Sequence, residues 1–313
     1  MHDPHISGAT RLVALLGDPV AHSISPQIHN HAFRAYGLPL AYVPLNVHAS
    51  KLNHAVSAIR WCGFAGANVT IPHKRSVAAY CDRVSEISRR IGAVNTLYFD
   101  GDRLRGTTTD PEGFFKALMS MGHDCRGDRC VILGNGGTAR TLAYALALRQ
   151  LPSSLTLVGR REERVRPLAE EISAHTDPAV DWTLFDSDSL GTIMKECTLC
   201  VNCTSVGMHP HADRSPLAPE YFHDGMTVLD AVYNPAETLF LSHARRAGCT
   251  AQNGLRMLLY QGLASQKLWT GTEVDEAIYD MEELQGLVTT GRNNHERNRG
   301  HGGAENEPPL HST

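Results

Sequence analysis

A strand followed at once by closely spaced glycines constrains the fold of this chain more than any other feature. Residues 131–140 read Val-Ile-Leu-Gly-Asn-Gly-Gly-Thr-Ala-Arg, which places G-x-G-x-x-A between an apolar run and a helical pattern. In such a turn the first glycine allows the sharp bend, the second lets the backbone approach a pyrophosphate, and the small third residue lets the helix pack on the strand. The motif predicts a dinucleotide-binding βαβ unit, and a glycine-rich turn without a ligand is the alternative.

The residues after the second strand of this unit indicate which dinucleotide it binds. Sites for NAD usually carry an acidic residue about 20 residues past the glycines, where it accepts hydrogen bonds from the ribose hydroxyls. Here Arg160 lies 24 residues after Gly136 (160 − 136 = 24), with Arg161 and Arg164 close behind. A guanidinium pairs with a 2′-phosphate that a carboxylate would repel. The pattern favours NADP, and a solvated helix start of mixed charge is the alternative because two glutamates follow.

Apolar, strand-like runs alternate with helical patterns through most of the chain, which indicates βαβ units and a mostly parallel sheet. The first series comprises runs 12–17, 41–47 and 66–71, followed by a hairpin of 96–99 and 103–106 that turns at 100–102. The second series comprises runs 130–133, 155–158, 182–185, 199–203 and 227–231. Because 313 residues correspond to about two domains, we interpret each series as one domain.

Helix signals complete this outline. Ser25, followed by proline, predicts an N-cap for a helix that ends near Tyr36, and Ser50 predicts the cap of a second helix that ends near Gly63. Two further helical patterns run over 255–269 and 273–287. From residue 289 to 313 the composition is polar with almost no apolar residue, so we expect a disordered tail there.

Charge and composition exclude several classes of partner. The 29 basic and 33 acidic residues give a net charge of −4, which provides no electrostatic footprint for nucleic acid or an anionic membrane. The sequence has neither an apolar run long enough to span a bilayer nor a secretory signal, so we expect a cytoplasmic protein with eight reduced cysteines. Cys197-x-x-Cys200-x-x-Cys203 lacks a fourth ligand at the expected spacing, and we expect no metal. Small molecules remain as partners.

Polar residues in the first series gather where the predicted strands end. They form His22-Ser-Ile-Ser-Pro26, Asn68-Val-Thr-Ile-Pro-His-Lys74 and Gly92-Ala-Val-Asn-Thr96. Ligands of open α/β sheets bind outside the carboxyl ends of the strands. Hydroxyls, amides and one of only five lysines in the chain would suit a polyhydroxylated ligand with a carboxylate. Taken singly, each of these residues is more typical of a cap, a turn or a surface charge.

Together with four later blocks, these motifs resemble the shikimate dehydrogenase family over about residues 11–271. The later blocks are Gly134-x-Gly-Gly-x-x-Arg140, Asn202-x-Thr-Ser-Val-Gly-Met208, Asp230-x-x-Tyr-x-Pro-x-x-Thr238 and Asn253-Gly-Leu-x-Met-Leu-x-x-Gln-Gly262. The resemblance implies an α/β protein with a discontinuous substrate domain and a Rossmann NADP-binding domain. It implies a substrate domain of residues 1–109 and 253–288, a cofactor domain of residues 110–252, and reversible reduction of 3-dehydroshikimate to shikimate in the pathway to chorismate and aromatic amino acids.

The resemblance also implies roles for individual residues. The catalytic pair of the family falls on Lys74 and Asp110. The substrate ligands fall on Ser23, Ser25, Asn68, Thr70, Lys74, Asn95, Asp110, Tyr233 and Gln261. The cofactor ligands fall on Gly134, Asn135, Gly136, Gly137, Thr138, Ala139, Arg160, Arg161, Arg164, Thr204, Val232, Gly254 and Met257. Chemically, an ammonium can stabilise and protonate the oxygen of a ketone that accepts a hydride, and a nearby carboxylate can orient it.

Two positions depart from the family pattern. Threonine replaces asparagine at Thr108, beside Asp110, and Gly159 replaces the asparagine that often contacts adenosine. Two alternatives therefore stay open at this point: an NAD-preferring quinate/shikimate dehydrogenase, and a non-catalytic NADP-binding regulator. The intact lysine–aspartate pair argues against the regulator. The sequence leaves a monomer and a homodimer equally possible.

Overall fold

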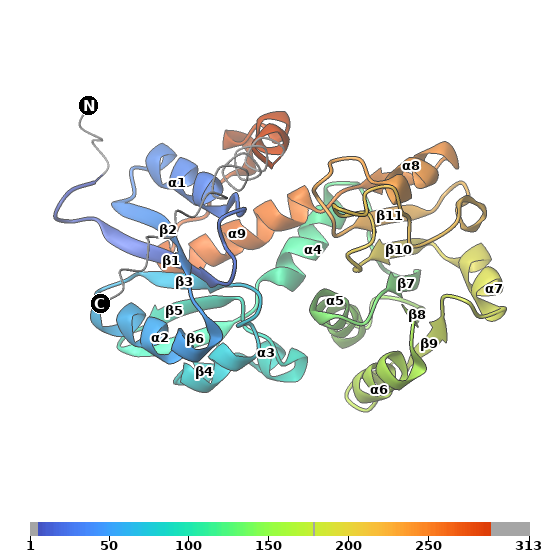
Figure 1. Ribbon diagram of the computed structural model, residues 1–313, viewed down its shortest axis with the longest axis horizontal. Coiled ribbons are helices and arrows are strands. Elements are labelled where there is room, and N and C mark those ends of the chain that lie inside the picture. Colours follow the sequence, from blue (N-terminus) through green and yellow to red (C-terminus); the bar gives the residue numbers. More distant parts are fainter. Residues whose placement is uncertain (1–5, 178, 289–313) are drawn as a thin grey trace, which may run out of the picture.

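The computed structural model describes residues 6–177 and 179–288, and it contains two six-stranded sheets that lie in separate lobes (Figure 1). The predicted disordered tail, 289–313, lies outside the described residues. Each lobe is built from one of the two βαβ series predicted from the sequence. The two-domain α/β fold class is therefore confirmed.

The first sheet has the strand order β2-β1-β3-β5-β6-β4. Its strands are β1 (Arg11–Gly17), β2 (Leu40–Asn46), β3 (Gly66–Val69), β4 (Arg83–Val84), β5 (Thr96–Asp100) and β6 (Arg103–Thr107). The first three are parallel, whereas β5 and β6 form the predicted antiparallel hairpin beside β3. The predicted strand 66–71 ends earlier, at Val69, because residues 71–75 form turns, the first of which is closed by the His73 N–H donating to the Thr70 carbonyl at 2.8 Å. The two-residue strand β4 was not predicted.

The helices of the first lobe are α1 (Ser25–Ala35), α2 (Leu52–Trp61) and α3 (Glu86–Ile91), with short 3₁₀ helices η1 (Ala49–Lys51) and η2 (Ser76–Tyr80). Both predicted serine caps are wrong. Ile24 is the N-cap of α1, and Ser25 is its first helical residue, whose N–H donates to Ser23 Oγ at 3.2 Å. Ser50 lies inside η1, where its N–H donates to His48 Nδ1 at 3.4 Å. In both places the side chain two residues upstream accepts the bond.

The second sheet is entirely parallel, with the order β12-β11-β10-β7-β8-β9. Its strands are β7 (Arg129–Leu133), β8 (Ser154–Gly159), β9 (Val180–Leu184), β10 (Leu199–Asn202), β11 (Thr227–Asp230) and β12 (Thr250–Gln252). The helices of this lobe are α5 (Gly137–Leu148), α6 (Glu162–Ser173), α7 (Ser189–Glu196) and α8 (Leu239–Arg246), with η3 (Pro219–Tyr221). Counted from β7, the order is 3-2-1-4-5-6, that of a Rossmann domain. The short edge strand β12 was not predicted.

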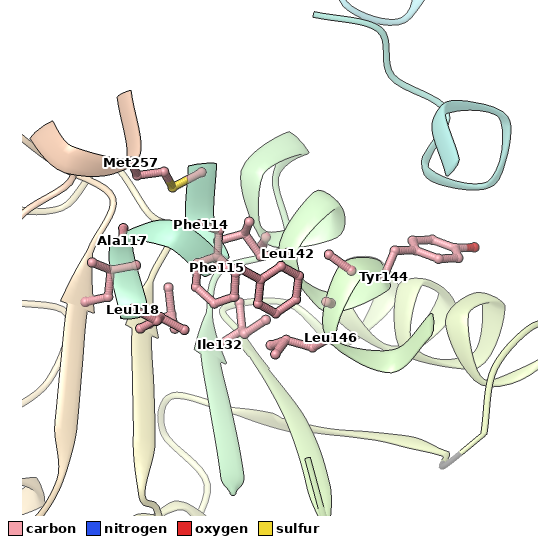
Figure 2. Close-up of a cluster of buried hydrophobic side chains, with 14 of the residues drawn as sticks. Phe114, Phe115, Ala117, Leu118, Ile132, Leu142, Tyr144, Leu146 and Met257 are labelled. Atoms are coloured by element: carbon pink, nitrogen blue, oxygen red, sulfur yellow. The ribbon is translucent and has the colours of Figure 1, made fainter. Parts of the chain in front are cut away.

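Helices α4 (Asp110–Met119) and α9 (Leu255–Thr270) run between the lobes and pack against each other (Figure 1). They approach closely at Gly113, where a Cβ would lie only 2.6 Å from the carbonyl oxygen of Met257. Phe114 and Phe115 continue this contact into the second lobe, where they pack with Ile132 and Leu142 (Figure 2). These two helices connect the lobes.

After α9 the structure differs from the single predicted helix 273–287. A 3₁₀ turn, η4 (Glu276–Ile278), comes first, and residues 281–288 then form a helix. The Asp280 carboxylate accepts from the N–H groups of Glu282 and Glu283, which starts the new helix and explains the interruption. No helix among the described residues is long and apolar enough to cross a membrane.

Candidate active site

The predicted polar residues of the first lobe meet at the carboxyl ends of β1 and β3. Thr70 directly follows β3, and it lies so close to β1 that a Cβ on Gly17 would be 2.3 Å from Thr70 Cγ2. The segment that carries Lys74 is bonded to the segment that carries Asn95, because the Val94 N–H donates to the Lys74 carbonyl at 2.7 Å. The fold thus joins motifs that are far apart in the sequence.

Lys74 and Asp110 form an ion pair in this cluster. Lys74 Nζ lies 2.7 Å from Asp110 Oδ2, and the side chains are 33% and 15% exposed. Asp110 is the first residue of α4, where the helix dipole favours a carboxylate. A partly exposed ammonium held by a fixed carboxylate can reach a ligand and still keep its orientation.

Asn95 holds the other oxygen of Asp110. Its Nδ2 donates to Asp110 Oδ1 at 2.7 Å, while its Oδ1 accepts from the Thr109 N–H at 2.9 Å. Gln261, on α9, brings its Oε1 within 3.2 Å of Asn95 Nδ2. The structure therefore brings together four predicted site residues: Lys74, Asn95, Asp110 and Gln261.

Asn68 belongs to a buried network beside this group. Its Oδ1 accepts from the Tyr42 hydroxyl at 2.9 Å, and its Nδ2 donates to Ser265 Oγ at 3.0 Å. Ser265 Oγ also lies 3.0 Å from Thr109 Oγ1 and 2.8 Å from Thr96 Oγ1. Sequence reasoning missed Tyr42 and Ser265, because each becomes a neighbour of the site only through tertiary packing. The glutamine–glycine motif of α9 was the one available signal for Ser265, three residues downstream.

Ser23 and Ser25 lie between β1 and the first turn of α1. Ser23 Oγ is 3.1 Å from Ser25 Oγ, and both side chains are partly exposed. The N–H groups of a helix start favour an anion, and two hydroxyls beside them add further donors. The pair can therefore bind a carboxylate.

Three predicted cofactor ligands and one predicted substrate ligand lie near the start of α9 and the end of β11. The Gly254 N–H donates to the Val232 carbonyl at 3.1 Å, and a Cβ on Gly254 would lie 2.4 Å from the Ala231 carbonyl oxygen. Met257 is buried in the core cluster with Phe114 (Figure 2). Tyr233 is half-buried, and its burial raises the pKa of its phenol.

Buried Asp230 supports the loops that follow β10 and β11. Its carboxylate accepts from Asn202 Nδ2 at 2.9 Å, from the Val232 N–H at 3.0 Å and from Thr238 Oγ1 at 2.6 Å. Burial raises the pKa of Asp230 to about 6, because the three donors only partly replace water. Asn202 Oδ1 in turn accepts from Thr204 Oγ1 at 2.7 Å, which fixes a predicted cofactor residue.

The glycine loop of the second lobe borders a pocket of about 810 Å³. Gly134 has a φ of +108° and turns the chain from β7 toward α5. A Cβ on Gly136 or Gly137 would meet nothing within 4 Å, so the start of α5 faces open space. Gly134, Asn135, Gly136, Arg160 and Thr204 line the pocket, and none of its lining residues is acidic. These features fit a dinucleotide, with its pyrophosphate at the helix start.

The three predicted phosphate-binding arginines differ in position. Arg160 lines the pocket, whereas Arg161 and Arg164 are not among the lining residues. Arg161 Nε lies 3.6 Å from Glu163 Oε1, so its charge is partly compensated. All three are exposed. The pocket is also lined by His211 and Arg214, which the sequence did not assign to the site.

One group with metal-ligand chemistry occurs among the described residues, formed by His123, Cys125 and Asp128. His123 Nε2 and Asp128 Oδ2 bond each other at 2.6 Å, and Thr227 and Thr198 engage their remaining atoms at 3.0 and 2.7 Å. The group lies at the amino ends of β7, β10 and β11, opposite the glycine loop. These hydrogen bonds hold the loop before β7 against the starts of β10 and β11. The eight cysteines are free thiols, and Cys197 and Cys200 are buried beside β10.

Comparison with known proteins identifies the family. The family model described as the shikimate dehydrogenase substrate binding domain matches residues 15–97. The shikimate dehydrogenase (NADP(+)) of Moorella thermoacetica is 44% identical over 289 residues, which cover 91% of this chain and 97% of that protein. The chain belongs to the shikimate dehydrogenase family.

Solved structures agree with this assignment. The shikimate 5-dehydrogenase of Thermus thermophilus, solved with NADP(H) and shikimate, matches with a TM-score of 0.78 and 33% identity, over 90% of this chain and 100% of that one. A quinate dehydrogenase from Corynebacterium glutamicum, solved with NAD, matches with a TM-score of 0.79 and 27% identity, over 90% and 99% of the chains. The same architecture thus occurs in proteins named for different substrates and cofactors.

Thr108, where this chain departs from the family pattern, is buried next to the site. Its backbone lies between β6 and α4, and its side-chain oxygen has no hydrogen-bond partner. An orphaned hydroxyl at a buried position costs free energy. The asparagine of the family would present two polar groups in the same place, so the substitution changes the packing next to Asp110.

Proposed function

We propose that this protein is an NADP-dependent shikimate dehydrogenase that reversibly reduces 3-dehydroshikimate to shikimate, a step toward chorismate and the aromatic amino acids. The observation that carries the proposal is the Lys74–Asp110 ion pair of 2.7 Å, set among amides and hydroxyls at the carboxyl ends of β1 and β3. A relative of 44% identity bears the name of this activity, which supports the same reading.

The substrate is held by groups that suit a carboxylated, hydroxylated ring. Ser23 and Ser25 bind the carboxylate beside the start of α1. The ring hydroxyls are bound by a set of amides, hydroxyls and the catalytic pair, namely Asn68, Thr70, Lys74, Asn95, Asp110, Tyr233 and Gln261. Asn68 and Asn95 have fixed orientations, since each is already bonded on both sides. The site is thus preorganised for its ligand.

Reduction of the ketone to an alcohol requires a hydride and a proton. NADPH, when bound, supplies the hydride. Lys74 donates a hydrogen bond to the ketone oxygen, where negative charge develops, and transfers the proton to it. Asp110 orients the ammonium at 2.7 Å and accepts a hydrogen bond from a neighbouring substrate hydroxyl, which keeps its proton. After the transfer, Lys74 regains its proton from water. The reverse reaction uses the same groups in the opposite order.

The cofactor is held by residues of the second lobe. Gly134–Ala139 cradle the pyrophosphate at the start of α5, and Arg160, Arg161 and Arg164 receive the 2′-phosphate. Thr204, Val232, Gly254 and Met257 line the path toward the substrate lobe. Support comes from the open space at Gly136 and Gly137 and from the absence of a carboxylate among the residues that line the pocket.

The same proposal divides the chain into residues 1–109 with 253–288 for the substrate and residues 110–252 for the cofactor. The crossings near Asp110 and Asn253 then act as hinges, and the cleft closes when both ligands are bound, which excludes water from the hydride transfer. We also propose a cytoplasmic location, which suits eight free thiols. Monomer and homodimer remain the two candidates for the oligomeric state.

Initial rates of the purified full-length protein with shikimate and with quinate, each against NADP⁺ and NAD⁺, test the proposal. We expect the highest kcat/KM for shikimate with NADP⁺. A higher kcat/KM for quinate with NAD⁺ would instead support an NAD-preferring quinate/shikimate dehydrogenase. The similarity to a quinate dehydrogenase solved with NAD is the reason to test this alternative. Binding of NADP⁺ without turnover of either substrate would support the regulator.

A further inference from the structure

The pocket beside the glycine loop is lined by a second arginine that the family motifs do not account for. Its lining includes Arg160, which follows β8, and also His211 and Arg214, which belong to the loop between β10 and η3. None of the ion pairs or side-chain hydrogen bonds found among the described residues engages Arg160 or Arg214. Neighbouring arginines differ: Arg161 pairs with Glu163 and Arg166 with Glu170.

The loop that carries Arg214 is anchored at both ends. At its start, the Thr204 N–H and hydroxyl donate to Asn202 Oδ1 at 2.9 and 2.7 Å. At its end, Leu217 is buried in the core, and its carbonyl accepts from Ser215 Oγ at 2.6 Å. Between these points the backbone follows successive turns, including a bond from the Arg214 N–H to the His211 carbonyl at 3.2 Å. The backbone of Arg214 is therefore held in place while its side chain stays exposed.

Two arginines that line one pocket without an acidic partner predict that an anionic part of the ligand binds there. Asp213, the acidic neighbour of Arg214 in sequence, does not line the pocket, and neither does any other carboxylate of the described residues. The pyrophosphate belongs at the start of α5, whereas the ribose phosphate belongs at the end of the second strand, where Gly159 and Arg160 lie. Gly159 lines the same pocket and offers no side chain where the family places an asparagine, and a Cβ there would lie 2.6 Å from Val165 Cβ.

We propose that Arg214 is a second ligand of the 2′-phosphate of NADP. It would act together with Arg160, which lies in a different loop. The inference rests on the proposed function and extends it to a loop that lies outside the family motifs. It gives the chain a source of NADP selectivity in place of the missing asparagine. Because a guanidinium binds two phosphate oxygens in a fork, two arginines can share one phosphate.

Equilibrium binding of 2′,5′-ADP and of 5′-ADP, measured by titration calorimetry on the full-length protein, tests this assignment without turnover. Arg214→Met keeps the aliphatic stem and removes the charge. We expect it to weaken 2′,5′-ADP binding by about tenfold, the scale of one charge-assisted hydrogen bond, and to leave 5′-ADP binding within about twofold. Arg214→Lys should recover part of the loss. Arg126→Met, an exposed arginine before β7, is the matched control and should bind both probes like the unmodified protein.

The outcomes separate the inference from the proposed function. If the unmodified protein binds 2′,5′-ADP no better than 5′-ADP, the NADP preference itself is wrong. If it prefers 2′,5′-ADP and Arg214→Met binds like the unmodified protein, only the role of Arg214 is overturned. Equal weakening of both probes would assign Arg214 to the pyrophosphate or to loop order and would also overturn the proposal. Circular dichroism melts verify that each variant is folded.

Discussion

Arg140 Nε donates to the carbonyl oxygen of Ile91 at 2.5 Å, which ties the first turns of α5 to the end of α3 in the other lobe. The same guanidinium donates from Nη1 to Glu171 Oε2 at 2.7 Å, and the Tyr144 hydroxyl donates to Glu171 Oε1 at 3.0 Å. In Figure 2 the ring of Tyr144 projects away from Phe114 and Phe115, out of the core that joins α4 to α5. The helix that follows the phosphate loop is thus linked to the substrate lobe.

This relationship predicts a loss of stability when Arg140 is replaced. Arg140→Met leaves the carbonyl of Ile91 without this donor and the Glu171 carboxylate without its cationic partner. Because Glu171 is 42% exposed, water compensates part of the loss, and we expect a cost of about 1–2 kcal/mol. For a chain of this size the melting temperature should fall by roughly 1.5–3 °C in a calorimetric scan.

A matched control comes from α6, where exposed Arg166 pairs with Glu162 and Glu170 along one helix. Arg166→Met should leave the melting temperature unchanged, because exposed pairs within a helix contribute little. Equal melting temperatures for the Arg140 variant and the unmodified protein would show that the link between the lobes does not stabilise the fold.

Lys74→Ala tests the chemistry. The variant loses the group that protonates the ketone oxygen, so we expect kcat to fall by roughly two to four orders of magnitude, with a much smaller change in the KM for shikimate. Steady-state kinetics in both directions measure the effect. Lys116 is a suitable control, because it pairs with Glu112 on the surface of α4, and its replacement by alanine should leave kcat intact. Near-full activity without Lys74 would remove it from the mechanism and favour the regulator.

Local sequence patterns predicted the elements whose signals are local. The glycine loop, the hairpin turning at Gly101 and the all-parallel second sheet follow from residues that are close together in the chain. The serine caps failed because Ser23 and His48, two residues upstream, supply the acceptors. The edge strands β4 and β12 have two and three residues, too few to show a period. The caps depended on a neighbouring side chain, and the edge strands depended on pairing with the rest of the sheet. Neither can be read from the propensities of the residues themselves.

The candidate site likewise contains residues that the sequence predicted and residues that only the structure revealed. The strand-end motifs indicated where polar side chains gather, and the family resemblance selected Lys74 and Asp110 from among them. Tyr42 and Ser265 could not be found in this way, because each contributes through a contact between elements that are far apart in the sequence. Ser265, for example, reaches Asn68 across 197 positions. A resemblance transfers known positions, whereas such neighbours emerge only from packing.

His29 makes the stability depend on pH. Its ring is buried, stacks on Tyr42 at a centroid distance of 4.4 Å, and has a pKa lowered by burial to about 4. Between pH 6.5 and 4 the unfolded chain binds a proton at His29 that the folded state does not bind. Falling pH therefore lowers the free energy of unfolding, by about 3 kcal/mol through this group. Asp230, whose pKa is raised to about 6, acts in the opposite direction below about pH 6, over most of this window.

The effect is isolated by comparing the unmodified protein with His29→Gln, since Asp230 is present in both. Urea unfolding at a series of pH values should show a loss of stability from pH 6.5 to 4 that is smaller in the variant by about 3 kcal/mol. The absolute stability of the variant does not matter, because only the difference in slope is used. Parallel curves for the two proteins would mean that His29 is accessible to protons in the folded state.

Arg160 provides the sharpest test of the cofactor. It lines the pocket and has no acidic partner, whereas Arg161 shares its charge with Glu163. Arg160→Ala should raise the KM for NADP⁺ roughly ten- to a hundredfold, corresponding to about 1.5–3 kcal/mol for a charge-assisted pair, and leave that for NAD⁺ almost unchanged. Arg161→Ala should have a smaller effect. Initial rates with both cofactors at saturating shikimate measure the ratio. If Arg160→Ala weakened both cofactors equally, Arg160 would support the fold of the loop rather than recognise the 2′-phosphate.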